Sequence, residues 1–179
     1  MAVLSVVSLG TGSAEYLTRG GEAAMRNAKQ LVLRTGRSPI ASFLTEQGFD
    51  FDTLDDLYEQ CEDFDAFHQA AAVTLFSRMK EGDLCYVVSD AAFDGTVFAL
   101  QRLKPRDLEL RIVPGVSLAD CCLSLIKRQS GHVRIMSACE LEESKLLPDE
   151  PLLLCELYSR ECAGDCKLKL MELLPDELP

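Results

Sequence analysis

Three short apolar segments of this chain each run into a tight turn, and these turns carry the residues best suited to hold a small ligand. The turns lie within Val7–Ser13, Val87–Ala92 and Ile112–Ser117. The first has a Gly-x-Gly pattern and the third has a Pro-Gly pair, and both patterns bring bare backbone close to a ligand. Ligands of open α/β sheets bind outside the carboxyl ends of the strands. We therefore expect the three turns to form one crevice.

The first turn, Gly10-Thr11-Gly12, supplies positive φ angles and accessible backbone amides. A dinucleotide fingerprint needs a third glycine, but Glu15 stands at that position. Two interpretations stay open: an ordinary strand-to-helix turn and a loop for a different cofactor.

The other two turns add polar side chains. The carboxylate of Asp90, in Ser89-Asp90-Ala91, can accept from a ribose or an amine, or it can cap a helix that begins near Ala92. The sequence favours the cap. The hydroxyl of Ser117 can cap the helix that follows it and can also face a ligand.

Composition narrows the classes of partner. The chain has 179 residues and a formal net charge of −11. A strongly acidic protein lacks the basic surface that nucleic acids and anionic membranes require, so we expect neither as a partner. No signal peptide and no apolar run long enough to span a bilayer is present, which predicts a soluble, cytoplasmic protein.

The sequence gives little evidence for a metal site. Cys162 and Cys166 lack CxxC spacing and a nearby histidine, so we interpret the eight cysteines as reduced thiols rather than zinc ligands. Glu59, Glu62 and Asp65 are spaced like magnesium ligands, but the facing acidic pair that such a site needs is missing. We predict a solvated helix face there and no metal site.

Apolar runs alternate with helical patterns through the first two thirds of the chain, which predicts an α/β fold with a mostly parallel sheet. Strands are expected at 2–9, 31–33, 51–54, 84–88 and 108–113, and helices at 15–30, 39–47, 63–80, 93–103 and 118–127. Strands near 132–137 and 152–157 and a helix at 160–174 follow. His68 and His132 are interpreted as structural. We place the domain boundary between 1–113 and 114–179.

Taken in order, these motifs resemble the tetrapyrrole (corrin/porphyrin) methylase family, in particular the N-terminal methylase-like domain of MazG-associated proteins of the YabN type. The resemblance covers nearly the whole chain. It rests on Gly10-x-Gly12-x-x-Glu15, Leu33-Arg34-Thr35-x-Arg37, Phe51 to Glu59, Ile112 to Ser117, Tyr158-Ser159-Arg160 and Asp165 to Glu172. It implies two α/β lobes, with a second lobe shorter than the family's. It also implies S-adenosylmethionine (SAM) in the cleft between them, and a homodimer.

The resemblance also implies which residues contact the cofactor. Carried over position by position, they are Gly10, Thr11, Gly12, Ser89, Asp90, Ala91, Pro114, Gly115, Ser117, Leu118, Glu156 and Leu157. It identifies no catalytic residue. The family pattern has Gly where Ser8 stands, Pro at Thr11, Asp-Pro at Ser13-Ala14, and Gly-Asp-Pro or Gly-His-Pro at Asp90-Ala91-Ala92.

Two functions therefore stay open. One is SAM-dependent methyl transfer to an unidentified small molecule, which needs alignment more than a catalytic triad because the donor is already activated. The other is a degenerate, non-catalytic binding or regulatory module of a MazG-type nucleotide pyrophosphohydrolase system. A porphyrinoid acceptor would need cations for its carboxylates. Arg34 and Arg37 are candidates, with surface solubility as the alternative role.

Overall fold

The computed structural model describes residues 2–11, 13–127, 133–138, 141, 151–155, 157 and 159–173. The chain forms two compact units, Met1–Leu118 and Ala119–Pro179, and each is described by itself. The domain boundary expected after residue 113 lies a few residues before the boundary between these units.

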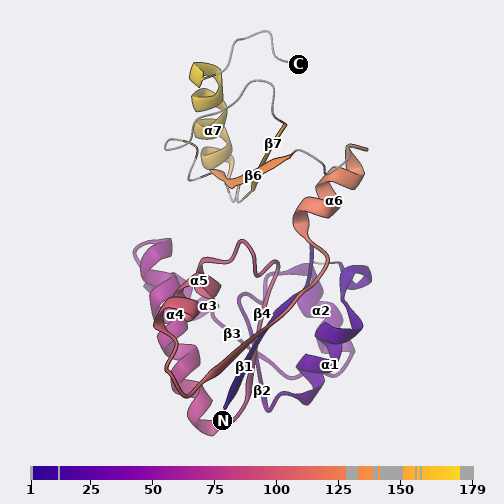
Figure 1. The fold of residues 1–179 in the computed structure, drawn as a ribbon, viewed down its shortest axis with the longest axis vertical. Helices are drawn as coiled ribbons and strands as arrows, with labels where there is room; N and C mark the ends of the chain where they lie inside the picture. The colour runs from indigo at the N-terminus through magenta and orange to yellow at the C-terminus, as the bar shows by residue number, and fades with distance from the viewer. Residues whose placement is uncertain are drawn as a thin grey trace. The chain divides into compact units, whose positions relative to one another are not determined.

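The first unit is built on a parallel sheet of five strands (Figure 1). The strands are β1 (Val3–Ser8), β2 (Gln30–Leu33), β3 (Asp52–Thr53), β4 (Leu84–Val88) and β5 (Glu109–Val113). Their order across the sheet is β3-β2-β4-β1-β5, and every pairing is parallel. The predicted α/β fold with a mostly parallel sheet is confirmed.

Helices cover both faces of this sheet. They are α1 (Arg19–Asn27), α2 (Pro39–Glu46), α3 (Asp55–Gln60), α4 (Phe64–Arg78) and α5 (Gly95–Leu103), with 3-10 turns η1 (Ala14–Tyr16) and η2 (Met79–Glu81). Figure 1 shows α1 and α2 on one face and α3 to α5 on the other. The helix expected over 15–30 is divided into η1 and α1, because the Thr18 side chain caps a new helix by accepting from the Gly21 N–H.

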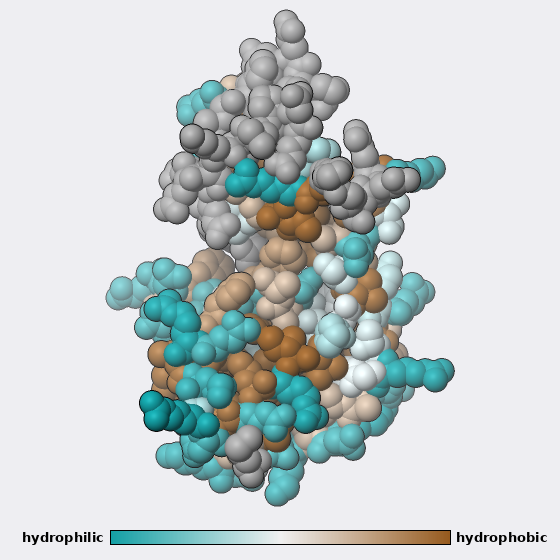
Figure 2. All heavy atoms as spheres, viewed as in Figure 1, coloured by the Kyte–Doolittle hydropathy of each residue, from teal (hydrophilic) through white to brown (hydrophobic). Residues whose placement is uncertain are grey.

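The central strands are mostly apolar because both of their faces are buried. Val6 and Tyr86 belong to the core that packs against α4 and α5. Their neighbours Val7 and Val87 belong to the core that packs against α1 and α2. Figure 2 shows polar residues around the outside of this unit and apolar residues gathered in the middle of one face.

The connections of the sheet create a switch point between β1 and β4. The chain leaves β1 through α1 toward β2 and β3, and it leaves β4 through α5 toward β5 on the opposite face. Neighbouring β1 and β4 send their connections in opposite directions, and open α/β folds bind ligands at the carboxyl ends of such strands.

The second unit is smaller. It contains α6 (Leu118–Leu125, which begins at the boundary), β6 (Arg134–Ser137), β7 (Leu152–Cys155) and α7 (Arg160–Leu173). Strands β6 and β7 pair in parallel, and Met136, Ala138, Leu141 and Cys166 form a small core. Among the helices in the described part of the chain, none is long and apolar enough to cross a membrane.

Candidate functional site

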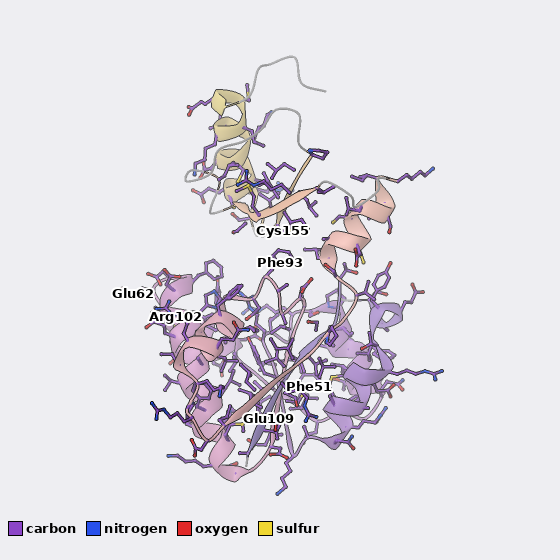
Figure 3. The ribbon with its side chains drawn as sticks, viewed as in Figure 1. Phe51, Glu62, Phe93, Arg102, Glu109 and Cys155 are labelled. Atoms are coloured by element: carbon purple, nitrogen blue, oxygen red, sulfur yellow. The ribbon has the colours of Figure 1, made fainter. Side chains whose placement is uncertain are left out.

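The turns after β1 and β4 lie side by side at one end of the sheet. The backbone N–H groups of Leu9 and Gly10 donate to the carbonyl oxygens of Val88 and Ser89, each at 2.9 Å. These bonds continue the β1–β4 ladder past the last paired residues, so the two turns are held in register. Figure 3 shows Phe93, just beyond the β4 turn, at this end of the sheet.

All three turns meet at Ser8, the last residue of β1. Its buried hydroxyl accepts the Ala91 N–H at 2.9 Å. A Cβ on Gly115 would overlap the Ser8 carbonyl, so the β5 turn approaches closely enough to require glycine. Gly10 has a φ of 81°, and a Cβ there would lie 3.1 Å from the Val116 carbonyl oxygen.

Asp90 links the β4 turn to the start of α6. Its carboxylate accepts the Ala92 N–H at 3.0 Å and the Leu118 N–H at 3.1 Å. The expectation that Asp90 caps a helix beginning near Ala92 is wrong, because α5 begins at Gly95 and Asp94 is its N-cap. Asp90 instead closes a local turn and anchors the first residue of α6.

The structure thus brings together nine of the residues that the sequence assigned to a cofactor. They are Gly10, Thr11, Ser89, Asp90, Ala91, Pro114, Gly115, Ser117 and Leu118, all within the first unit. Gly12 and Glu156 lie outside the described residues, and Leu157 is an exposed residue of the second unit. That any of these residues binds a cofactor stays a prediction.

An ion pair between half-buried Arg34 and buried Asp94 lies next to the β4 turn. Arg34, directly after β2, donates from Nη1 to Oδ2 of Asp94 at 2.7 Å, and Asp94 is only 3% exposed. The other carboxylate oxygen of Asp94 accepts the Val97 N–H. Burial, and then the nearby Asp94 charge, raise the pKa of the Tyr86 phenol well above its usual range, so this phenol stays neutral.

Potential metal ligands do not gather in the described part of the chain, where no three His, Cys, Asp or Glu side chains are grouped to hold an ion. His68 lies 3.0 Å from the Thr96 hydroxyl and packs on the rings of Phe64 and Phe67. These contacts agree with the structural role expected for it. His132 lies outside the described residues.

Comparison with known families decides the class of the chain. The model of the tetrapyrrole (corrin/porphyrin) methylases matches residues 3–157. The chain belongs to this family. A relative within reach of sequence comparison is the uncharacterized protein YabN of Bacillus subtilis (strain 168), 28% identical over 178 residues. The match covers 97% of this chain but 36% of the relative, so the chain spans about a third of that relative's length.

Solved structures show the tetrapyrrole methylase fold for this chain. The putative cobalamin synthesis related protein CobF from Corynebacterium diphtheriae superposes with a TM-score of 0.64 at 17% identity, covering 92% of this chain and 76% of that one. The cobalamin biosynthesis precorrin-6Y methylase (cbiE) from Archaeoglobus fulgidus gives 0.61 at 15% identity, covering 90% and 78%.

Two departures of this chain from the tetrapyrrole methylase pattern have structural partners. Ser8 accepts the Ala91 N–H, and Asp90 accepts the Leu118 N–H. Sequence reasoning noted both substitutions but missed both contacts.

Both arginines proposed to meet acceptor carboxylates already have carboxylate partners. Arg34 pairs with buried Asp94, and Arg37 pairs with Glu59 on the surface. Arg34 is therefore a structural residue rather than one that serves only solubility. Neither side chain offers an unpaired cation to a ligand.

A groove of about 360 Å³ lies along α1, away from the cluster of turns. Small residues of α1, including Ala23 and Ala24, line it together with Ser5 of β1 and Arg111 of β5. Among the residues assigned to the cofactor that the structure describes, none lines this groove. A ligand-binding experiment must therefore localise its ligand.

Proposed function

We propose that this chain binds SAM at the turns after β1, β4 and β5 and acts as a methyltransferase domain of the tetrapyrrole methylase class. The observation that supports the proposal best is the junction at Ser8. It gathers the three turns at the switch point of the sheet, where open α/β folds bind ligands.

The residues present suit a ligand with an adenosine and an amino-acid tail. Gly10 and Gly115 have no side chain to cover the backbone where the turns meet. Thr11 and Ser89 are exposed, so their hydroxyl groups are accessible to a ligand, and Pro114 is exposed beside them. The net charge of −11 favours a cationic sulfonium over an anionic nucleotide.

SAM supplies a methyl group that its positive sulfonium has already activated. The protein must hold the donor and acceptor in line and exclude water, and such positioning can supply much of the rate enhancement. In this proposal the three turns hold the donor. Their tethers to Ser8 and Asp90 keep that surface from moving.

The proposed acceptor is a small molecule of the cyclic tetrapyrrole class, as the family description suggests. Since Arg34 and Arg37 are engaged in ion pairs, the carboxylates of such an acceptor would have to find other cations. We further propose the homodimeric state and the cytoplasmic location that the sequence led us to expect.

A second candidate is a non-catalytic module that binds a ligand and regulates an attached pyrophosphohydrolase of the MazG type. The internal use of the Ala91 and Leu118 amides favours it, because each withdraws a donor from a cofactor. The two candidates share the fold and the cluster of turns and differ in turnover.

Isothermal titration calorimetry with SAM and with its demethylated product, S-adenosylhomocysteine (SAH), tests the proposal. We expect saturable binding with a Kd below about 1 mM for both, and none for ATP. Amide hydrogen exchange should show protection at residues 9–11, 89–92 and 114–118. No heat with either ligand, or protection confined to the groove along α1, would contradict the proposal.

Turnover separates the two candidates. Methyl-labelled SAM incubated with a panel of cyclic tetrapyrroles should yield labelled acceptor and SAH. Binding of SAM without release of SAH for any acceptor would favour the regulatory module.

A further inference from the structure

We infer that Ser8 is the positioning residue of the site, and that its hydroxyl fixes the β4 turn in the conformation that receives the ligand. The inference rests on the proposed function. It concerns a residue that the sequence analysis did not assign to the cofactor.

The first step is the contact itself. Ser8 is 4% exposed, and Ala91 is 7% exposed. The Ser8 hydroxyl accepts the Ala91 N–H at 2.9 Å in this buried setting, across two neighbouring strands. Without the hydroxyl, the Ala91 N–H would lose the one partner that the structure gives it in a place that water reaches poorly.

The second step is the neighbourhood of the contact. The Ser8 carbonyl lies against Gly115, and the chain continues after Ser8 to Gly10, whose backbone N–H donates to the Ser89 carbonyl. Ser8 therefore touches the β4 turn with its side chain and the β5 turn with its backbone. A change in its side chain alters one of these contacts and leaves the other in place.

The third step follows the connection outward. Ala91 is next to Asp90, whose carboxylate holds the Leu118 N–H at the start of α6. The Ser8 hydroxyl thus sets the position of Ala91, and through the adjoining residue it sets the distance between the β4 turn and the β5 turn. Loss of the hydroxyl releases the Ala91 end of the β4 turn, while the bonds of Ser89 and Asp90 to the other two turns remain.

The test compares Ser8→Ala with Ser5→Ala, which removes a hydroxyl from the same strand outside the cluster, and with Ser8→Thr, which keeps the hydroxyl. Each variant is first shown to be folded by circular dichroism. Two quantities are then measured: the Kd for SAH by calorimetry, and the exchange rate of the Ala91 amide by mass spectrometry or NMR.

For Ser8→Ala we expect the Kd for SAH to rise about tenfold. The Ala91 amide should exchange at least about tenfold faster, because one buried hydrogen bond is lost. Ser5→Ala should stay within about twofold of the wild type in both measurements. Ser8→Thr keeps the hydroxyl but adds a methyl group at a buried site, so it should keep Ala91 exchange slower than in Ser8→Ala. Unchanged Ala91 exchange in Ser8→Ala overturns the inference. So does an unchanged SAH Kd in that variant when the wild type binds SAH.

The failure of the proposed function gives a different result. In that case the wild type and all variants give no heat with SAH, while Ala91 exchange still shows whether the Ser8 hydroxyl holds the β4 turn.

Discussion

At the scale of single residues, Gly115 shows why the Pro-Gly turn after β5 tolerates no side chain. A Cβ on this residue would overlap the backbone carbonyl of Ser8, which cannot move without disturbing β1. We predict that Gly115→Ala lowers the free energy of unfolding by about 1–3 kcal/mol and weakens SAH binding. Urea denaturation followed by circular dichroism measures the first effect.

Gly20→Ala in α1 is the matched control. A Cβ on Gly20 would lie 3.8 Å from the nearest atom, Cγ1 of Val113, which is an ordinary contact. Because alanine favours a helix over glycine, this variant should be neutral or more stable by at most about 1 kcal/mol. Equal urea midpoints for the two variants would refute the close approach at Gly115.

At the scale of secondary structure, the strands that are buried on both faces could be predicted from the sequence. The short elements at the surface could not. β4 is apolar from Leu84 to Val88, and it occupies the expected residues. α3 was missed because it has six residues and no side-chain cap. The start of α5 was misplaced because Asp90 and Asp94 both suit an N-cap, and only the pairing of Asp94 with Arg34 distinguishes them.

The candidate site could likewise be predicted only in part from the sequence. The sequence located the three turns, because each follows an apolar strand and contains glycine, proline or a capping residue. It did not reveal the Ser8–Ala91 and Asp90–Leu118 tethers, which join residues that are distant in sequence. Contacts of this kind depend on the order of strands in the sheet, and no local pattern encodes that order.

The Arg34–Asp94 pair ties the end of β2 to the start of α5. Asp94 is buried, so Arg34→Met would leave its carboxylate without a counter-ion in a poorly solvated place. We predict a loss of about 3 kcal/mol in the free energy of unfolding, since breaking a buried pair on one side is costly. Urea denaturation at neutral pH provides the measurement.

Arg37→Met, in the same loop, is the control for that prediction. Arg37 and its partner Glu59 are 69% and 61% exposed, and exposed pairs contribute at most about 1 kcal/mol. If Arg34→Met costs no more than Arg37→Met, the buried pair does not brace the β4 turn.

At the scale of the whole molecule, the two units have cores of very different size. In the first unit, both faces of a five-stranded sheet are packed. In the described part of the second unit, four buried residues form the core around a pair of strands. Because stability grows with buried apolar surface, we expect the second unit to unfold at a lower denaturant concentration than the first.

Buried thiols allow each unit to be followed separately. Burial raises the pKa of the Cys85 thiol in β4 to about 12, and Cys155 and Cys166 are buried in the second unit. A buried thiol reacts with iodoacetamide only after its unit opens, since the thiolate is the nucleophile. Labelling across a urea series, read peptide by peptide in a mass spectrometer, should modify Cys155 and Cys166 at lower urea than Cys85. Modification of all three at one urea concentration would instead mean that the chain unfolds as a single cooperative body.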